Sequence, residues 1–144
     1  MRNLFLVLLL SITTLFFSCK KNGCVDRDAE NYCKDCKDAG GCVYKSSLVF
    51  WYDESTAKKL LAEGITGDLR YFIDQNLAGS AASNVYWTSP PNCGQDQAVT
   101  AVLEGRVAYH NLTITIIDKN DQIVWYLINV WGKQNQCLQF QLTK

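Results

Sequence analysis

Apolar and polar residues alternate with a period of two in several segments after residue 47. This alternation is typical of β-strands that place one face in a core and the other in water. Turn-forming residues separate the segments, and we expect hairpins at Glu104–Gly105 and at Asp118–Asp121. We therefore predict about seven short strands in an antiparallel β-sandwich. The positions that alternate toward the core are Leu48, Phe50, Tyr52, Leu69, Tyr71, Ile73, Val99, Ala101, Leu103, Leu112, Ile114, Ile116, Leu138, Phe140 and Leu142.

The segment Ile123–Val130 departs from the alternation because nearly all of its residues are apolar. Such a run suits a central strand that is covered on both faces. We therefore expect it in the middle of a sheet.

One further segment has helical rather than strand spacing, and we predict a short helix that packs across an open end of the sandwich. Apolar residues recur there at three- and four-residue intervals, between residues that cap helices. The apolar positions are Ala57, Leu60 and Leu61; the candidate caps are Asp53 or Ser55 at the start and Gly64 at the end.

The N-terminus carries an apolar stretch of 14 residues, Leu4–Phe17, after the basic Arg2. It is shorter than the roughly 20 residues that a membrane-spanning helix needs. The small residue Ser18 precedes Cys19, and two lysines follow. Residues 1–18 are therefore predicted to be a cleaved lipoprotein signal, with Cys19 as the lipidated N-terminus of a short tether, residues 19–23.

This junction resembles the signals of Bacteroidetes lipoproteins, which often end in a similar Phe-x-Ser-Cys-Lys run. The resemblance implies a thioether-linked diacylglycerol on Cys19 and an acylated amine, so the bilayer is an expected partner. Surface-exposed lipoproteins of that group tend to carry acidic residues after the cysteine, whereas Lys20 and Lys21 are basic. We therefore expect the periplasmic side of the outer membrane rather than the cell surface.

The charge of the chain gives no indication of nucleic-acid binding. After residue 18 there are 13 basic and 14 acidic residues, because Arg2 is the one charge before that point. A nucleic-acid interface needs a clustered basic surface. The length suits one modest domain with a small appendage.

The cysteines divide the mature chain into two units. Seven are present, and six remain when the lipidated Cys19 is set aside. An even number in an exported protein favours disulfide bonds. Four fall in the segment 24–46 and two in the predicted sandwich, residues 47–144. Since free thiols are improbable in that compartment, we expect Cys93 to pair with Cys137.

The segment 24–46 resembles a small cysteine-rich repeat of secreted and surface proteins. That repeat runs Gly-Cys-Thr-Asp, then Ala-x-Asn-Tyr, then Asp-Asp-Gly-Ser-Cys and an aromatic residue. We expect Cys24–Cys42 as its outer bridge, while Cys33 and Cys36 close on each other or cross-pair. Crosslinks replace a core here, because the segment is poor in apolar residues. The matching positions are Gly23, Cys24, Asp26, Ala29, Asn31, Tyr32, Asp38, Gly40, Cys42 and Tyr44.

Two metal hypotheses compete with this purely structural interpretation. Hard carboxylate oxygens are calcium ligands, although the acidic residues lack the spacing of a known calcium loop. The pair Cys33-x-x-Cys36 has the spacing of zinc ligands, which an oxidising compartment disfavours. The candidate calcium ligands are Asp26, Asp28, Asp35 and Asp38.

Most of residues 48–142 resembles a sandwich module of Bacteroidetes lipoproteins. The resemblance implies an immunoglobulin- or transthyretin-like fold and no assigned activity. It rests on Tyr71-Phe72-Ile73-Asp74, Gly79-Ser80, Val85-Tyr86-Trp87-Thr88, Pro91-Asn92-Cys93-Gly94, Trp125, Cys137 and Leu138-x-Phe140-x-Leu142.

The residues do not indicate an enzyme. The sole histidine, His110, falls in a predicted strand, and no Gly-x-Ser-x-Gly elbow or phosphate-binding glycine loop is present. Most of the many aromatic residues are expected in the core. Trp87, which precedes a proline-containing loop, is the best candidate for an exposed contact with a partner.

We therefore expect a lipid-anchored, exported, non-enzymatic binding or structural module of the cell envelope. Its partner would be an envelope protein or a glycan. The alternative is a calcium-dependent adhesion or interaction module that uses the acidic cysteine-rich segment.

Overall fold

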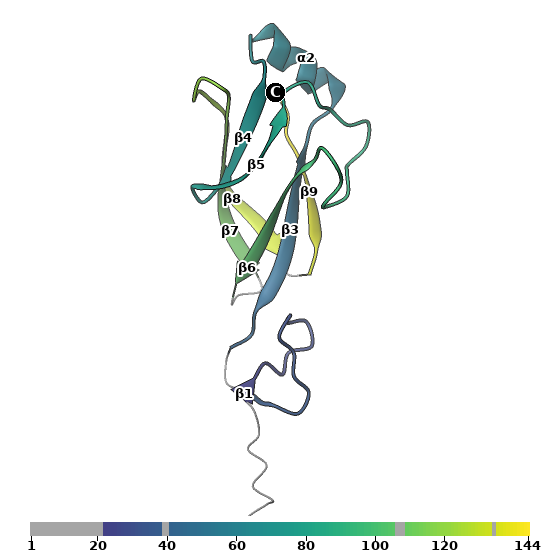
Figure 1. Ribbon diagram of the computed structural model, residues 1–144, viewed down its shortest axis with the longest axis vertical. Coiled ribbons are helices and arrows are strands. Elements are labelled where there is room, and N and C mark those ends of the chain that lie inside the picture. The colour runs from purple at the N-terminus through teal and green to yellow at the C-terminus, as the bar shows by residue number, and fades with distance from the viewer. Residues whose placement is uncertain (1–21, 39–40, 106–108, 134) are drawn as a thin grey trace, which may run out of the picture.

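The computed structural model describes residues 22–38, 41–105, 109–133 and 135–144. These residues form a two-sheet β-sandwich with one helix, preceded by a small disulfide-bonded segment (Figure 1). The predicted mainly-β fold is confirmed. The elements are β1 (Asn22–Gly23), β2 (Lys37–Asp38), β3 (Tyr44–Trp51), α2 (Glu54–Ala62), β4 (Asp68–Ile73), β5 (Asn76–Ala82), β6 (Val99–Gly105), β7 (Tyr109–Ile117), β8 (Ile123–Lys133) and β9 (Cys137–Gln141).

The two sheets of the sandwich have three and four strands. The first has the order β6-β3-β9, in which β3 pairs antiparallel with β6 and parallel with β9. The second has the order β5-β4-β7-β8, and all its pairings are antiparallel. The parallel pairing of β9 is a departure from the fully antiparallel sandwich that the sequence predicts.

The core lies between the two sheets. Phe50 of β3 and Tyr71 of β4 meet across it with ring centroids 5.4 Å apart. At the α2 end, Tyr52 stacks on Trp125 with centroids 5.9 Å apart. The alternation in the sequence identified most of these inward positions. The buried core comprises Leu48, Phe50, Tyr52, Ala57, Leu60, Leu69, Tyr71, Ile73, Val99, Ala101, Leu112, Ile114, Ile116, Trp125 and Leu142.

One of the two predicted hairpins is present. The turn after β7 leads directly into β8, and the Asp118 carboxylate accepts hydrogen bonds from the backbone N–H groups of Asn120 and Gln122. The prediction of a hairpin at Glu104–Gly105 is wrong. Strand β6 pairs with β3 whereas β7 pairs with β4 and β8, so the chain changes sheets there.

The position predicted for Ile123–Val130 is also wrong. This segment lies in β8, which is an edge strand of the four-stranded sheet. Trp125 points into the core, while Tyr126 and Ile128 are about 60% exposed on the outer face. The apolar residues on the outer face made the sequence look like that of a strand covered on both sides.

The cysteine-rich segment has a small core of its own. The structure joins Cys24 to Cys42, as expected, and closes Cys33 on Cys36. Cys24 is fully buried in a cluster with Ala29 and Tyr44. The segment contacts the sandwich through Asn135, whose side chain donates to the backbone carbonyl of Asp28.

The third disulfide joins two segments of the sandwich. Cys93 lies in the long β5–β6 connection and pairs with Cys137 at the start of β9, as the sequence predicts. Beside it, the Gln139 side chain donates to the carbonyl oxygen of Pro91 at 3.1 Å. The connection is therefore held against the edge strand β9.

We expect the three disulfides to differ in their contribution to stability. In the chain-entropy model, a bridge across 44 positions contributes about 4 kcal/mol, whereas one across 3 positions contributes about 2 kcal/mol. Replacing Cys93 and Cys137 by serine should therefore lower the free energy of unfolding about twice as much as replacing Cys33 and Cys36. Urea unfolding of the two double variants measures this. Equal losses would contradict the ranking.

The buried tyrosines make a second prediction. Burial raises the pKa of Tyr52 to about 12 and raises that of Tyr71 further. The folded state therefore retains these protons above pH 10, where the unfolded chain releases them, so stability falls as pH rises through the range from about 10 to about 12. Tyr52 alone accounts for a loss of about 3 kcal/mol.

Thermal unfolding across this pH range tests the effect. The Tyr52→Phe variant should lose less stability between the ends of the range than the unsubstituted chain. Tyr126→Phe, at an exposed position, is the matched control and should follow the unsubstituted chain. If the Tyr52→Phe variant loses as much stability over this pH range as the unsubstituted chain, Tyr52 does not cause the loss.

Candidate binding site

An apolar hollow with a volume of about 520 Å³ lies beside α2. The helix contributes one wall, with Ala57, Lys58 and Leu61, and Ser83, Asn84 and Tyr86 contribute another. Residues 65–67 complete the lining. Concave apolar surfaces of this size are typical binding sites.

The helix forms where the sequence predicts it, and Asp53 is its N-cap. The Asp53 carboxylate accepts from the backbone N–H of Thr56 at 2.8 Å and from the Ser55 hydroxyl, and these hydrogen bonds lower the pKa of Asp53. Ala57 and Leu60 are buried against the core, as expected.

Leu61, which the sequence groups with Ala57 and Leu60 as the apolar positions of the helix, does not face the core. Its side chain is 66% exposed and lies in the groove wall. Adjacent helical positions point about 100° apart, so a helix of nine residues resting on one surface buries one leucine and exposes the other. Two adjacent leucines in so short a helix therefore indicated, from the sequence alone, that one of them would be exposed.

The polar groups around this groove are largely engaged within the protein. The buried Ser83 donates its backbone N–H to Gly67 and its hydroxyl to the carbonyl of Ile65. On the rim, Lys58 pairs with Glu54 at 3.0 Å. The groove therefore offers an apolar surface with a neutral rim, which suits the apolar side chains of a partner better than a charged ligand.

Trp87, the expected contact residue, is half-buried, and its backbone N–H donates to the carbonyl of Tyr52 at 2.9 Å. Its neighbour Tyr86 is 44% exposed and lines the groove. The groove lining includes Tyr86 but neither Trp87 nor the proline-containing loop that follows it.

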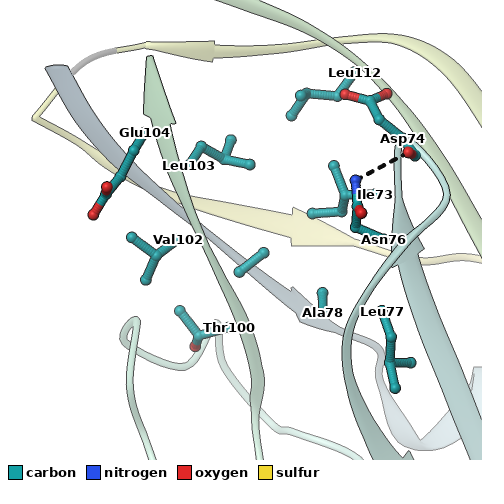
Figure 2. A pocket seen from close by; sticks show the side chains of 11 residues that line it. Ile73, Asp74, Asn76, Leu77, Ala78, Thr100, Val102, Leu103, Glu104 and Leu112 are labelled. Atoms are coloured by element: carbon teal, nitrogen blue, oxygen red, sulfur yellow. Dashed lines mark hydrogen bonds between the residues drawn. The ribbon is translucent and has the colours of Figure 1, made fainter. Parts of the chain in front are cut away.

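A second hollow of about 440 Å³ lies where the sandwich opens between β6 and the β4–β5 hairpin (Figure 2). The exposed side chains of Leu77 and Val102 and two acidic residues line it. The Asp74 carboxylate accepts from the backbone N–H of Thr113, and Glu104 pairs with Lys45 at 3.1 Å. Both carboxylates are therefore engaged in contacts that hold the strands.

The acidic side chains that the structure describes in the cysteine-rich segment take part in local hydrogen bonds or are exposed. The Asp26 carboxylate accepts from the Tyr44 hydroxyl at 2.7 Å and from the backbone N–H of Asp28, and these bonds lower its pKa. Asp35 is exposed. Among the described side chains, which do not include that of Asp38, no group of three potential metal-ligating residues comes together.

Other candidate residues fall in β7 or outside the described part of the chain. His110 lies in β7 opposite Gly132 of β8. Cys19 and the predicted signal, residues 1–18, lie outside the described residues. The helices that the structure describes include none with the length and hydrophobicity to cross a membrane.

Comparisons with known proteins return no relative. No protein-family model matches the chain, and neither the curated proteins nor the solved structures include a significant match.

Proposed function

We propose that this chain is an exported, acyl-anchored binding module of the cell envelope that performs no catalysis. Cys19 holds the chain to the periplasmic side of the outer membrane, and the groove beside α2 binds a protein partner. The observation that carries the proposal is the arrangement along the long axis. The cysteine-rich segment lies at one end of the molecule and α2 at the other (Figure 1). A chain anchored near residue 19 therefore directs α2 away from the membrane.

The disulfide bonds support an exported location. All six cysteines after residue 19 are paired, and two of the bonds close 18 and 44 positions. Structural disulfides of this kind persist in oxidising compartments and are rare in the cytosol. The cysteine-rich segment depends on them, since its own buried cluster is small.

The groove supports a protein partner. Leu61 and Tyr86 both line the groove and are 66% and 44% exposed, so both gain burial when an apolar side chain binds there. Aromatic and aliphatic side chains that fill such pockets contribute much of the energy of protein interfaces. The preformed walls keep the entropy cost of binding low.

Labelling with radioactive palmitate tests the anchor. Cells that express the full chain should incorporate label into the protein, and the Cys19→Ala variant should incorporate none. Globomycin, which blocks processing of lipoprotein signals, should cause the unprocessed form to accumulate. An unlabelled protein of full length would refute the anchor.

Photo-crosslinking in cells tests the groove. A photoreactive phenylalanine analogue at Leu61 or Tyr86 should give a discrete adduct with another protein. The same analogue at Val25, which is 44% exposed in the cysteine-rich segment, is the matched control and should not give that adduct. A second substitution, Leu61→Glu at an exposed position of the groove lining, should reduce the adduct at Tyr86 at least tenfold. Adducts that form equally from all positions would contradict a specific groove.

A further inference from the structure

The outer face of the four-stranded sheet carries a row of mostly apolar residues across all four strands. The register pairs Leu77 of β5 with Phe72 of β4, Phe72 with Thr115 of β7, and Thr115 with Tyr126 of β8. Neighbouring strands lie about 4.8 Å apart, so these four side chains are in lateral contact range. We call this row, with Ile128 and Trp131 further along β8, the outer strip.

The outer strip is strongly exposed. Leu77, Tyr126, Ile128 and Trp131 are each about 60% accessible. Leu77 also borders the hollow of Figure 2, and Ile128 and Trp131 border a further hollow between β8 and β9. Asn111 lies opposite Trp131, and the Asn111 side chain donates to that of Asn129. Contiguous exposed apolar surface of this kind marks interaction sites.

The charge of this face favours a self-contact. Alternation places Asp68 and Arg70 on this face, at the end of β4 near α2. Arg70 forms an ion pair with Asp121 and donates to the Asp118 carbonyl. In a two-fold contact each patch meets its own copy, so unpaired charge would repel. The outer strip carries none, and a strongly charged partner finds no complement there.

The area of the face meets the requirement for a small dimer. Four strands of about eight residues cover roughly 19 by 26 Å, or about 500 Å² in projection. The accessible area exceeds the projection because the side chains stand out from the sheet. Two such faces therefore bury upward of about 1,000 Å², the lower bound for a specific interface.

We propose that the outer strip is the interface of a homodimer, in which the four-stranded sheets of two copies stack face to face. Aligned sheets pack about 10 Å apart, a distance that large side chains such as Tyr126 and Trp131 fill. The small area predicts a dissociation constant in the micromolar range. The proposal goes beyond the groove beside α2 and does not depend on it.

Sedimentation velocity of the full chain in detergent micelles tests the dimer over about a hundredfold range of concentration. The unsubstituted chain should pass from monomer to dimer. Tyr126→Lys and Leu77→Lys, which place two positive charges across the two-fold axis, should each raise the dissociation constant at least tenfold. Val102→Lys, at a 57% exposed position of β6 in the other sheet, is the matched control and should dimerise normally. Circular dichroism verifies that each variant is folded.

A photoreactive analogue at Tyr126 gives an independent readout in cells. An adduct with twice the mass of the chain, which contains peptides of this chain alone, supports the proposal. A monomer at every concentration, a dimer that persists in both lysine variants, or an adduct only with a different protein overturns it. Since palmitate labelling and the groove crosslinks are read separately, failure of the dimer leaves the proposed anchor and groove standing, and the reverse also holds.

Discussion

The register of β3 is the constraint on which the rest of the structure depends. This strand runs directly from the cysteine-rich segment to the N-cap of α2, and it is the central strand of its sheet. Leu48, Phe50 and Tyr52 all face the core, so a shift of one residue would turn the whole set to solvent. The same shift would move Asp53 away from the start of α2. The two ends of the molecule are therefore linked through one strand.

The C-terminus stabilises this arrangement at the α2 end. After β9, Leu142 is buried and its backbone N–H donates to the carbonyl of Trp51. The carbonyl of Thr143 accepts from the Trp125 indole, and Lys144 pairs with Glu63 after the end of α2. The last residues thus join both sheets and the helix. Because β9 runs parallel to β3, the end of β9 lies beside the end of β3, where α2 begins.

The sequence predicted the elements in which the two faces of a strand differ in polarity. The alternation in β3, β4 and β7 identified the buried positions, and residues such as Phe50, Tyr71 and Ile114 are indeed in the core. Strand β5 was missed because Asn76–Ala82 is rich in small residues and shows little alternation. Its Gly79 has a packing reason, since a Cβ there would lie 3.1 Å from the side chain of Val99.

The candidate surfaces were less predictable because their strands and helix do not show a clear difference in polarity between the two faces. In β8, apolar residues occupy both faces, and sequence reasoning reads such a strand as buried on both sides. The register with β7 instead turns Tyr126 outward, opposite Thr115. A single sequence reports the hydrophobicity of a side chain but not whether a second layer lies above it. Exposed apolar positions such as Leu61 and Tyr126 are therefore the ones that only a three-dimensional arrangement distinguishes from core.

Tyr52 links the sandwich core to the segments that line the groove beside α2. Its ring stacks on Trp125 in the core, and its hydroxyl donates to the carbonyl of Ala82, the residue before the groove residue Ser83. Its own carbonyl accepts from Trp87, just beyond the exposed Tyr86, and the next residue caps α2. Both walls are therefore fixed to a buried residue rather than to a mobile loop. A partner that enters between them meets a surface that is already ordered, so little conformational entropy opposes its binding.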